Sequence, residues 1–263
     1  METKRIEQGG MTFAYKEQGE GQAVVLLHGF CGSSDYWNEL LPLLPYHYRF
    51  IAPDLRGHGR SSAPEGAYTM EQFAEDLVRL LQLLQAERPI VLGHSLGGYA
   101  TLAFAEKHPQ LLSAFGLIHS TAYPDSDAAK EGRLKGMATI RGQGLPVFID
   151  GLIPKLFAPE HVKSMPEAVR SAVDIGLGTH PEGAVRTLEG MRTRPDRNRV
   201  LADAELPVLL VAGTHDQIVP PDRAFSVSGG TIMQREIDAA GHMSMVEAPR
   251  RLADIIVEFI SKV

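Results

Sequence analysis

Short apolar runs recur along this chain, and they constrain its fold more than any other feature. Each run is only a few residues long, is rich in Val, Leu and Ile, and is followed closely by Gly, His or Asp. Apolar residues without alternation predict strands that are buried on both faces, as in parallel sheets. The runs are Val24–Leu27, Phe50–Ala52, Ile90–Leu92, Phe115–Ile118 and Val208–Ala212, with Met233–Ile237 as a further candidate.

Helical periodicity separates these runs. Apolar side chains from Phe73 to Leu84 recur on one helical face after a candidate N-cap, Thr69, and Leu252–Ile260 repeats the pattern. Ser34 is a candidate cap for another helix, which would reach Leu44. Alternating strands and helices predict an α/β fold with a doubly wound, mostly parallel sheet. Thr12–Gln18 is more polar and alternating, so we expect an antiparallel strand at one edge.

Residues 121–204 interrupt the alternation of predicted strands and helices. They contain many prolines and no convincing buried strand, and short helical patterns cover 127–140, 145–156, 166–178 and 182–192. We interpret 121–204 as an inserted helical cap, and 1–120 with 205–263 as the α/β core. The alternative is that these helices belong to one layered domain.

Composition limits the classes of partner. The chain has 26 Lys and Arg against 32 Asp and Glu, for a net charge of −6. This balance suits an enzyme of small molecules and argues against nucleic acid, which needs a basic face. The single cysteine, Cys31, excludes an internal disulfide and favours a reducing compartment. No apolar segment has the pattern of a signal peptide or a membrane span, so we expect a cytoplasmic protein with no membrane partner.

One motif combines a reactive residue with the right context. Gly93-His94-Ser95-Leu96-Gly97 follows a predicted buried strand and precedes a segment rich in Ala and Leu. A serine between a strand and a helix sits on a sharp turn, and its hydroxyl is raised above the carboxyl end of the sheet. Glycines at both ends of the motif permit the chain to cross closely. Ser95 is therefore the candidate nucleophile.

A serine hydroxyl needs a base, and ten histidines are available. We select His242, which follows a candidate strand in a loop preceded by Gly241. Asp216 follows another strand and is the candidate acid that orients the imidazole through its Nδ1–H. Asp238 is the rival acid, but it lies only four residues before His242.

Backbone N–H groups are the candidate oxyanion donors. The Phe30 N–H lies in a glycine-containing loop after the first buried strand, and the Leu96 N–H opens a helix directly after Ser95. Cys31 is the competing nucleophile in the same loop. No base is implied beside it, so a packing role is the better interpretation.

Together these segments resemble the α/β-hydrolase fold superfamily, in the serine-nucleophile branch with a helical cap. The matching segments are His28–Phe30, Asp54–Ser61, Gly93–Gly98, Gly213–Asp216 and Gly241–Met243. Within this superfamily, the chain is most similar to small esterases, enol-lactonases and cofactor-free haloperoxidase-like enzymes. The resemblance implies that Asp54–Ser61 is a structural loop. Serine at position 95 disfavours dehalogenase and epoxide hydrolase chemistry, in which Asp holds that place. The long His-Gly-Gly-Gly loop of lipases is absent.

The expected function is hydrolysis of a small carboxylic ester or lactone through an acyl-enzyme. No cofactor and no metal are expected, since neither a His-Glu-x-x-His motif nor a dinucleotide fingerprint occurs. Two alternatives remain open: a hydrolase that cleaves a carbon–carbon bond in a diketone-like substrate, and a signalling protein that senses a ligand in the same pocket. The oligomeric state is not readable. Candidate pocket residues in the cap are Met137, Phe148, Leu152, Phe157 and Met165.

Overall fold

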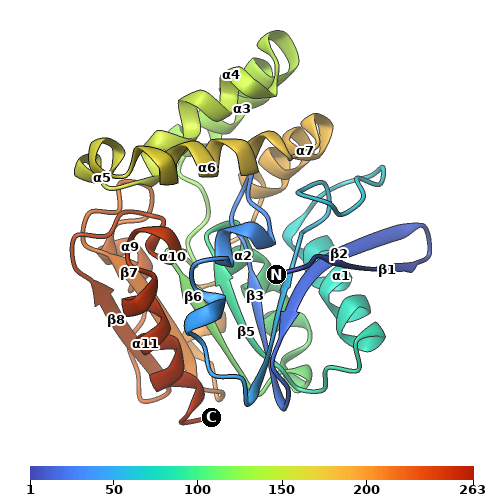
Figure 1. Cartoon of the computed structure of the whole chain (residues 1–263), viewed down its shortest axis with the longest axis vertical. Helices are drawn as coiled ribbons and strands as arrows, with labels where there is room; N and C mark the ends of the chain where they lie inside the picture. The colour runs from blue at the N-terminus through green and yellow to red at the C-terminus, as the bar shows by residue number, and fades with distance from the viewer.

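A computed structural model describes all residues, 1–263, and its centre is one mixed sheet (Figure 1). The strand order is β1-β2-β4-β3-β5-β6-β7-β8, and every pairing from β4 to β8 is parallel. The predicted doubly wound, mostly parallel sheet is confirmed. The strands are β1 (Lys4–Gln8), β2 (Met11–Gln18), β3 (Gln22–Leu27), β4 (Tyr48–Pro53), β5 (Ile90–His94), β6 (Ala114–Ile118), β7 (Val208–Gly213) and β8 (Ile232–Ile237).

The antiparallel end of the sheet differs from the prediction. β2 is antiparallel to β4, as expected, but it does not form the edge, because β1 pairs with its other side. β1 was not predicted. Four of its five residues are polar and exposed, and the half-buried Ile6 alone gives no apolar pattern, so the strand forms through its hairpin with β2.

Helices cover both faces of the sheet. α1 (Met70–Leu83) and α2 (Leu96–Lys107) lie on one face, and α11 (Pro249–Ile260) lies on the other (Figure 1). Thr69 caps α1, since its hydroxyl accepts a hydrogen bond from the Gln72 N–H at 3.1 Å. The prediction of a helix from Ser34 to Leu44 is wrong. Two 3-10 turns replace it, η1 (Ser34–Trp37), capped by the Ser33 hydroxyl, and η2 (Leu41–Leu43), where Pro42 interrupts helical bonding.

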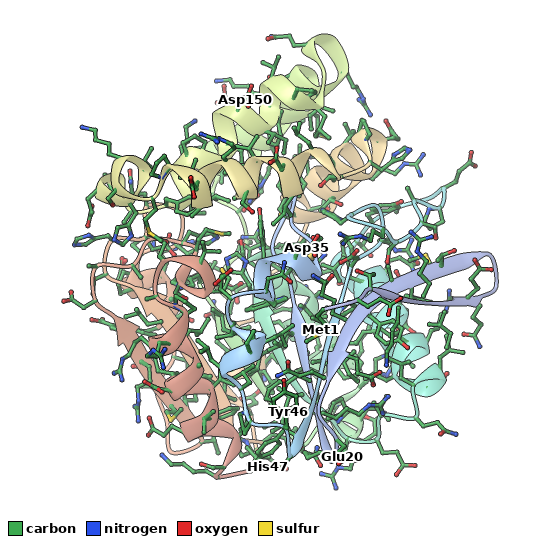
Figure 2. The ribbon with its side chains drawn as sticks, viewed as in Figure 1. Met1, Glu20, Asp35, Tyr46, His47 and Asp150 are labelled. Carbon is green, nitrogen blue, oxygen red and sulfur yellow. The ribbon has the colours of Figure 1, made fainter.

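The segment between β6 and β7 contains helices and no strand. Its bounds are α3 (Asp127–Gln143), α4 (Leu145–Leu152), η4 (Ile153–Leu156), α5 (Pro159–Ser164), α6 (Pro166–Leu177), α7 (Pro181–Arg192) and α8 (Asn198–Ala202). Helices α3 to α7 lie across the carboxyl ends of the strands (Figure 1), with Asp150 of α4 at one end of the molecule and His47 at the other (Figure 2). Three further short helices or turns complete the chain: η3 (Pro109–Leu111), α9 (Pro221–Ala224) and α10 (Ser244–Glu247). No helix is both long and apolar enough to cross a membrane.

Helix α7 rests directly on backbone of the α/β part. A Cβ on Gly190 would lie 1.9 Å from the Tyr68 carbonyl oxygen, and a Cβ on Gly183 would lie 2.9 Å from the Gly57 Cα. Both approaches are possible only because these positions have no side chain. The two glycines therefore set how closely α7 approaches the loop before α1.

Two glycines in neighbouring helices give opposite predictions. Gly190→Ala should lower the free energy of unfolding by about 2 kcal/mol or more, because its Cβ meets rigid backbone. Gly132→Ala in α3, where no atom lies within 4 Å of the new Cβ, should raise it by about 0.5–1 kcal/mol through helix propensity. Urea denaturation measures both. Equal effects of the two substitutions would contradict the close approach of α7.

Two buried histidines fix the loop after β4. His28 Nε2 accepts a hydrogen bond from the Leu55 N–H at 2.9 Å, while its Nδ1–H donates to the Gly29 carbonyl at 2.7 Å. His58 Nδ1–H donates to the Arg56 carbonyl at 2.9 Å. Burial lowers the pKa of His28 to about 4 and that of His58 to about 3. Both imidazoles are therefore neutral in the folded protein at pH 7.

These histidines predict loss of stability in mild acid. The folded pKa values lie below the ordinary value of 6.5, so below pH 6.5 the unfolded chain takes up protons that the folded chain does not. Each histidine should lower the free energy of unfolding by about 1.4 kcal/mol per pH unit, down to its folded pKa. In urea titrations at pH 7 and pH 5, His28→Gln should lose less stability than the wild type. Parallel pH dependences would refute this role for His28.

Candidate active site

Ser95 occupies a strained turn between β5 and α2. Its backbone has φ 50° and ψ −111°, a left-handed region that residues with a side chain rarely adopt. A Cβ on Gly93 would lie 2.2 Å from the Gly97 carbonyl oxygen, and one on Gly97 would lie 2.5 Å from the Leu27 carbonyl oxygen. The two glycines of the motif therefore allow the helix to cross close to β3 and β5 and so hold Ser95 at the carboxyl end of β5.

His242 and Asp216 form a hydrogen-bonded pair at the same edge of the sheet. His242 Nδ1–H donates to Asp216 Oδ2 at 2.8 Å, and both side chains are almost fully buried. Asp216 follows β7 and His242 follows β8, so strands that are adjacent in the sheet deliver the two groups. Because the carboxylate fixes the proton on Nδ1, the Nε2 of His242 is left as the basic nitrogen.

Asp216 is held as an anion by four donors. Its Oδ1 accepts from the Ile218 and Val219 N–H groups at 2.8 and 2.9 Å. Its Oδ2 accepts from His242 and also from His119 Nδ1–H, the latter at 3.0 Å. Burial alone would raise the pKa of the Asp216 carboxyl, but the two imidazoles hold it well below its usual range. The carboxylate therefore stays ionised beside His242.

His94 connects the serine turn to the histidine loop. Its Nε2–H donates to the His242 carbonyl at 2.9 Å, and the two ring centroids are 4.9 Å apart. Ser95, the next residue, donates its N–H to the Ile118 carbonyl at 3.0 Å. Neither the Ser95 hydroxyl nor His242 Nε2 makes a hydrogen bond, to each other or to any other group of the chain. Both atoms therefore keep their hydrogen-bonding capacity in the resting protein.

The two candidate oxyanion donors have no acceptor within the chain. Phe30 lies in the turn after β3, and its N–H makes no intramolecular hydrogen bond. Leu96 is the first residue of α2, so its N–H has no helical carbonyl to bond. A helix N-terminus also carries partial positive charge, which favours an anion.

The rival residues lie in less suitable places. Asp238 is exposed and its Oδ1 accepts from the Ala239 N–H and the Thr214 hydroxyl, with no bond to His242. Cys31 is fully buried, and burial raises the pKa of its thiol, so the reactive thiolate is disfavoured. Asp54 accepts from the Ser34 and Arg60 N–H groups, as a structural residue would.

Of the predicted pocket residues, Phe148 and Phe157 contact residues that neighbour the candidate site. The Phe148 ring meets the Phe30 ring edge-on, with centroids 5.9 Å apart. Phe157 is buried beside the histidine loop, and a Cβ on Gly241 would lie 2.6 Å from its carbonyl carbon. Met137 is elsewhere, on a groove of about 320 Å³ that it shares with Tyr68 and Arg186. Leu152 and Met165 are half-buried in the same helical segment.

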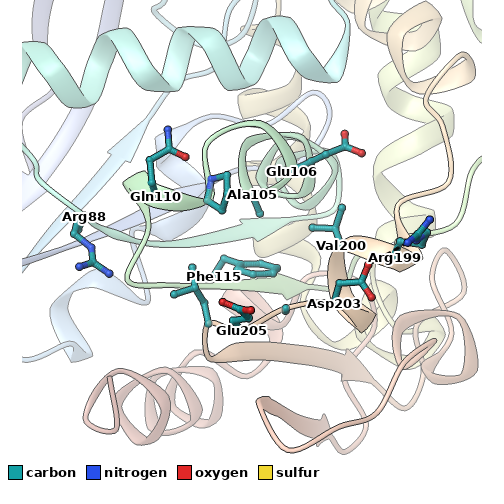
Figure 3. Close-up of a pocket in the computed structure, with 12 residues that line it drawn as sticks. Arg88, Ala105, Glu106, Gln110, Phe115, Arg199, Val200, Asp203 and Glu205 are labelled. Atoms are coloured by element: carbon teal, nitrogen blue, oxygen red, sulfur yellow. Dashed lines mark ion pairs between the residues drawn. The ribbon is translucent and has the colours of Figure 1, made fainter.

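A larger groove of about 710 Å³ lies away from these residues (Figure 3). It is lined by the end of α2, by α8 and by the residues that open β6 and β7, including Ala105, Val200, Phe115 and Leu206. It therefore opens at the amino ends of the strands, at the edge of the sheet opposite Ser95.

His119 is the member of the cluster that the sequence did not suggest. It directly follows β6, is fully buried, and contacts Asp216 through Nδ1 and the Ser244 hydroxyl through Nε2 at 2.7 Å. A signal was available, because His119 follows a buried strand just as Asp216 follows β7. A ring nitrogen of His119, a ring nitrogen of His242 and a carboxylate oxygen of Asp216 all lie within 4.8 Å of one another. Each imidazole donates a hydrogen bond from Nδ1–H to the carboxylate, so the three side chains form one hydrogen-bonded cluster.

Comparison with known proteins identifies the fold family. A family model described as alpha/beta hydrolase fold matches residues 22–141. The structure is similar to a thermophilic esterase from Thermogutta terrifontis, with 31% identity, a TM-score of 0.92, and coverage of 100% of this chain and 99% of that one. It is also similar to the enol-lactonase from Burkholderia xenovorans, with 25% identity, a TM-score of 0.89, and coverage of 98% and 100%.

A relative in sequence is a hydrolase of a different substrate class. The 2-hydroxy-6-oxo-6-(2'-aminophenyl)hexa-2,4-dienoic acid hydrolase of Metapseudomonas resinovorans is 26% identical, over 98% of this chain and 90% of its own length. The esterase and the enol-lactonase thus share the fold of this chain, and the hydrolase is similar to it in sequence. With the family match, the near-complete coverage by the esterase and the mostly parallel sheet, the chain belongs to the α/β-hydrolase fold family.

Proposed function

We propose that this protein hydrolyses a small carboxylic ester or lactone, with Ser95, His242 and Asp216 as its catalytic triad. One observation carries the proposal. The buried His242–Asp216 hydrogen bond of 2.8 Å stands at the carboxyl edge of the sheet, where the strained turn presents Ser95. The esterase and enol-lactonase that share this fold support the substrate class.

The reaction proceeds in two half-reactions. The Ser95 hydroxyl oxygen attacks the substrate carbonyl carbon while His242 Nε2 takes its proton, and Asp216 stabilises the imidazolium that forms. The tetrahedral intermediate collapses to an acyl-enzyme, and the alkoxide leaves with the proton from His242. Water then attacks the acyl carbon while His242 takes its proton, the bond between the acyl carbon and Ser95 Oγ breaks, and His242 returns the proton to Oγ. The products are the acid and the alcohol, or one hydroxy acid from a lactone.

Backbone dipoles stabilise the developing oxyanion. The Phe30 and Leu96 N–H groups are the donors, and neither makes a hydrogen bond within the chain. A single such donor is worth on the order of 3 kcal/mol in the transition state. Because these are main-chain groups, their geometry depends on the Gly29 and Gly97 turns and not on a side chain.

The helices between β6 and β7 form the cap over this site in our proposal, with residues 121–204 as the insertion and the rest as the core. Phe148 would line the acyl side of the pocket through its contact with Phe30. Phe157 sits behind Gly241 and supports the histidine loop. The apolar ring at Phe148 favours a small uncharged acyl group.

Ser95→Ala tests the nucleophile. The substitution removes the attacking oxygen and nothing that supports the fold, so kcat for p-nitrophenyl acetate should fall by about 10³-fold or more. Circular dichroism should show unchanged secondary structure. Mass spectrometry should show one fluorophosphonate adduct on Ser95 in the wild type and none in the variant. Near wild-type turnover in the variant would refute the assignment.

Asp216→Asn and Asp238→Asn form a matched pair for the acid. Asn at 216 loses the acceptor charge and permits the wrong imidazole tautomer, so kcat should fall on the order of 10⁴-fold, as in the serine-protease precedent. Asn at the exposed position 238 should leave kcat within a few-fold of the wild type. Steady-state kinetics on the same ester measure both. A larger loss from Asp238→Asn would show that the acid is misassigned.

Cleavage of a carbon–carbon bond is the second candidate, favoured by the Metapseudomonas relative. Attack on a carbonyl begins both reactions, so the two differ in the leaving group, which here would be a stabilised carbanion that takes its proton from His242. A parallel screen of short-chain esters, lactones and vinylogous diketones separates them by the ratio of kcat/KM values. A slow single turnover with a retained adduct would instead indicate the ligand sensor.

A further inference from the structure

Two histidines share one oxygen of Asp216. His242 Nδ1 lies 2.8 Å and His119 Nδ1 lies 3.0 Å from the same atom, Oδ2. The other oxygen is already saturated by the Ile218 and Val219 N–H groups. The two imidazoles therefore occupy both acceptor sites of Oδ2, so His242 shares this oxygen with His119.

The protons of this cluster can be assigned from its chemistry. An ionised carboxylate only accepts hydrogen bonds, so both Nδ1 atoms must carry hydrogen. His119 Nε2 is then an acceptor, and the Ser244 hydroxyl donates to it at 2.7 Å. Burial lowers the pKa of His119, although Asp216 opposes the shift, so this imidazole remains neutral. Both of its nitrogens are occupied, and it has no free nitrogen to act as a base.

We propose that His119 is a positioning residue that sets the basicity of His242 by holding and partly neutralising Asp216. The proposal rests on the proposed function. The positive end of the His119 N–H dipole points at Oδ2, and this weakens the attraction between the carboxylate and a protonated His242. Removal of His119 should therefore strengthen the attraction of Asp216 for a protonated His242.

The other groups around His242 do not touch Asp216. His94 faces it with a ring centroid 4.9 Å away and bonds its carbonyl. The Glu247 carboxylate of α10 accepts from the Gly241 and Met243 N–H groups on either side of His242, and also pairs with His161 at 2.7 Å. These charges stay constant when residue 119 is changed, so a shift can be assigned to the shared oxygen.

Position 119 restricts which variants are informative. Its φ is 49°, in the left-handed region, where Asn is tolerated better than other residues. His119→Asn keeps an N–H donor near the place of Nδ1, while His119→Leu fills the space, excludes water and removes the donor. His108→Leu is the matched control, because His108 pairs with Glu75 at 3.0 Å away from the site.

The pH dependence of kcat/KM on p-nitrophenyl acetate tests the proposal. His119→Leu should raise the pKa of the acid limb by roughly 0.5–1 unit, because His242 gains the full attraction of Asp216. His119→Asn should restore the limb to within a few tenths of a unit, and KM should change little in either variant. His108→Leu should match the wild type. An unshifted acid limb in His119→Leu would overturn the proposal. Equal shifts in the Leu and Asn variants would also overturn it, because they would show that the N–H donor at position 119 has no effect on the limb.

A measurement on the wild type needs neither activity nor a folded variant. Nitrogen NMR of histidine-labelled protein should show His119 neutral, protonated at Nδ1 and accepting at Nε2, with a far-downfield N–H resonance beside that of His242. The opposite tautomer for His119, or a cationic His119 at pH 7, would overturn the proposal. If Ser95→Ala shows that the proposed hydrolysis is wrong, these resonances still report the shared oxygen, so the two failures are distinguishable.

Discussion

The close crossing of backbone at Gly93 and Gly97 is the constraint on which the site depends. It brings α2 against the ends of β3 and β5, and that contact holds Ser95 at a positive φ against its intrinsic preference. The strain is of order 1–3 kcal/mol and must be offset by the surrounding packing. The same turn presents the Leu96 N–H, so the serine and one candidate oxyanion donor are oriented by a single backbone feature.

Electrostatically, Asp216 is the centre of the site. Burying a carboxylate is costly unless its oxygens are satisfied, and here four N–H donors from three parts of the chain converge on it. Neighbouring parallel strands make this convergence possible, because β6 and β7 end side by side and the loop after β8 returns to them. The arrangement keeps a negative charge beside His242 without any contact with solvent.

The parallel strands were predictable because both of their faces are buried, so each appears in the sequence as an uninterrupted apolar run. Ser95 and Asp216 were predictable as positions for the same reason, since each follows such a run. β1 was not, because its side chains face solvent and its pairing comes from the hairpin. The helix predicted from Ser34 to Leu44 rested on Ser34 as a candidate cap, whereas Ser33 caps a short 3-10 turn and Pro42 interrupts helical hydrogen bonding after it.

Apart from the pairing of His242 with Asp216, the contacts between distant segments described above were not predicted. The sequence shows that His119 follows a buried strand, but its contact with Asp216 depends on how closely the ends of β6 and β7 approach, which the local sequence does not show. The positions of Met137 and Phe148 depend on how α3 and α4 rotate about their axes, which is decided by packing that includes the close contact between Gly136 and the Phe148 ring.

The polar character of β1 has a consequence for how copies of the protein meet. An exposed strand edge is a template for pairing with another chain, and charged side chains along it oppose that pairing. β1 carries Lys4, Arg5 and Glu7, and at the far edge β8 carries Arg235 and Glu236. Charged side chains at both edges of the sheet therefore disfavour the addition of a strand from another copy.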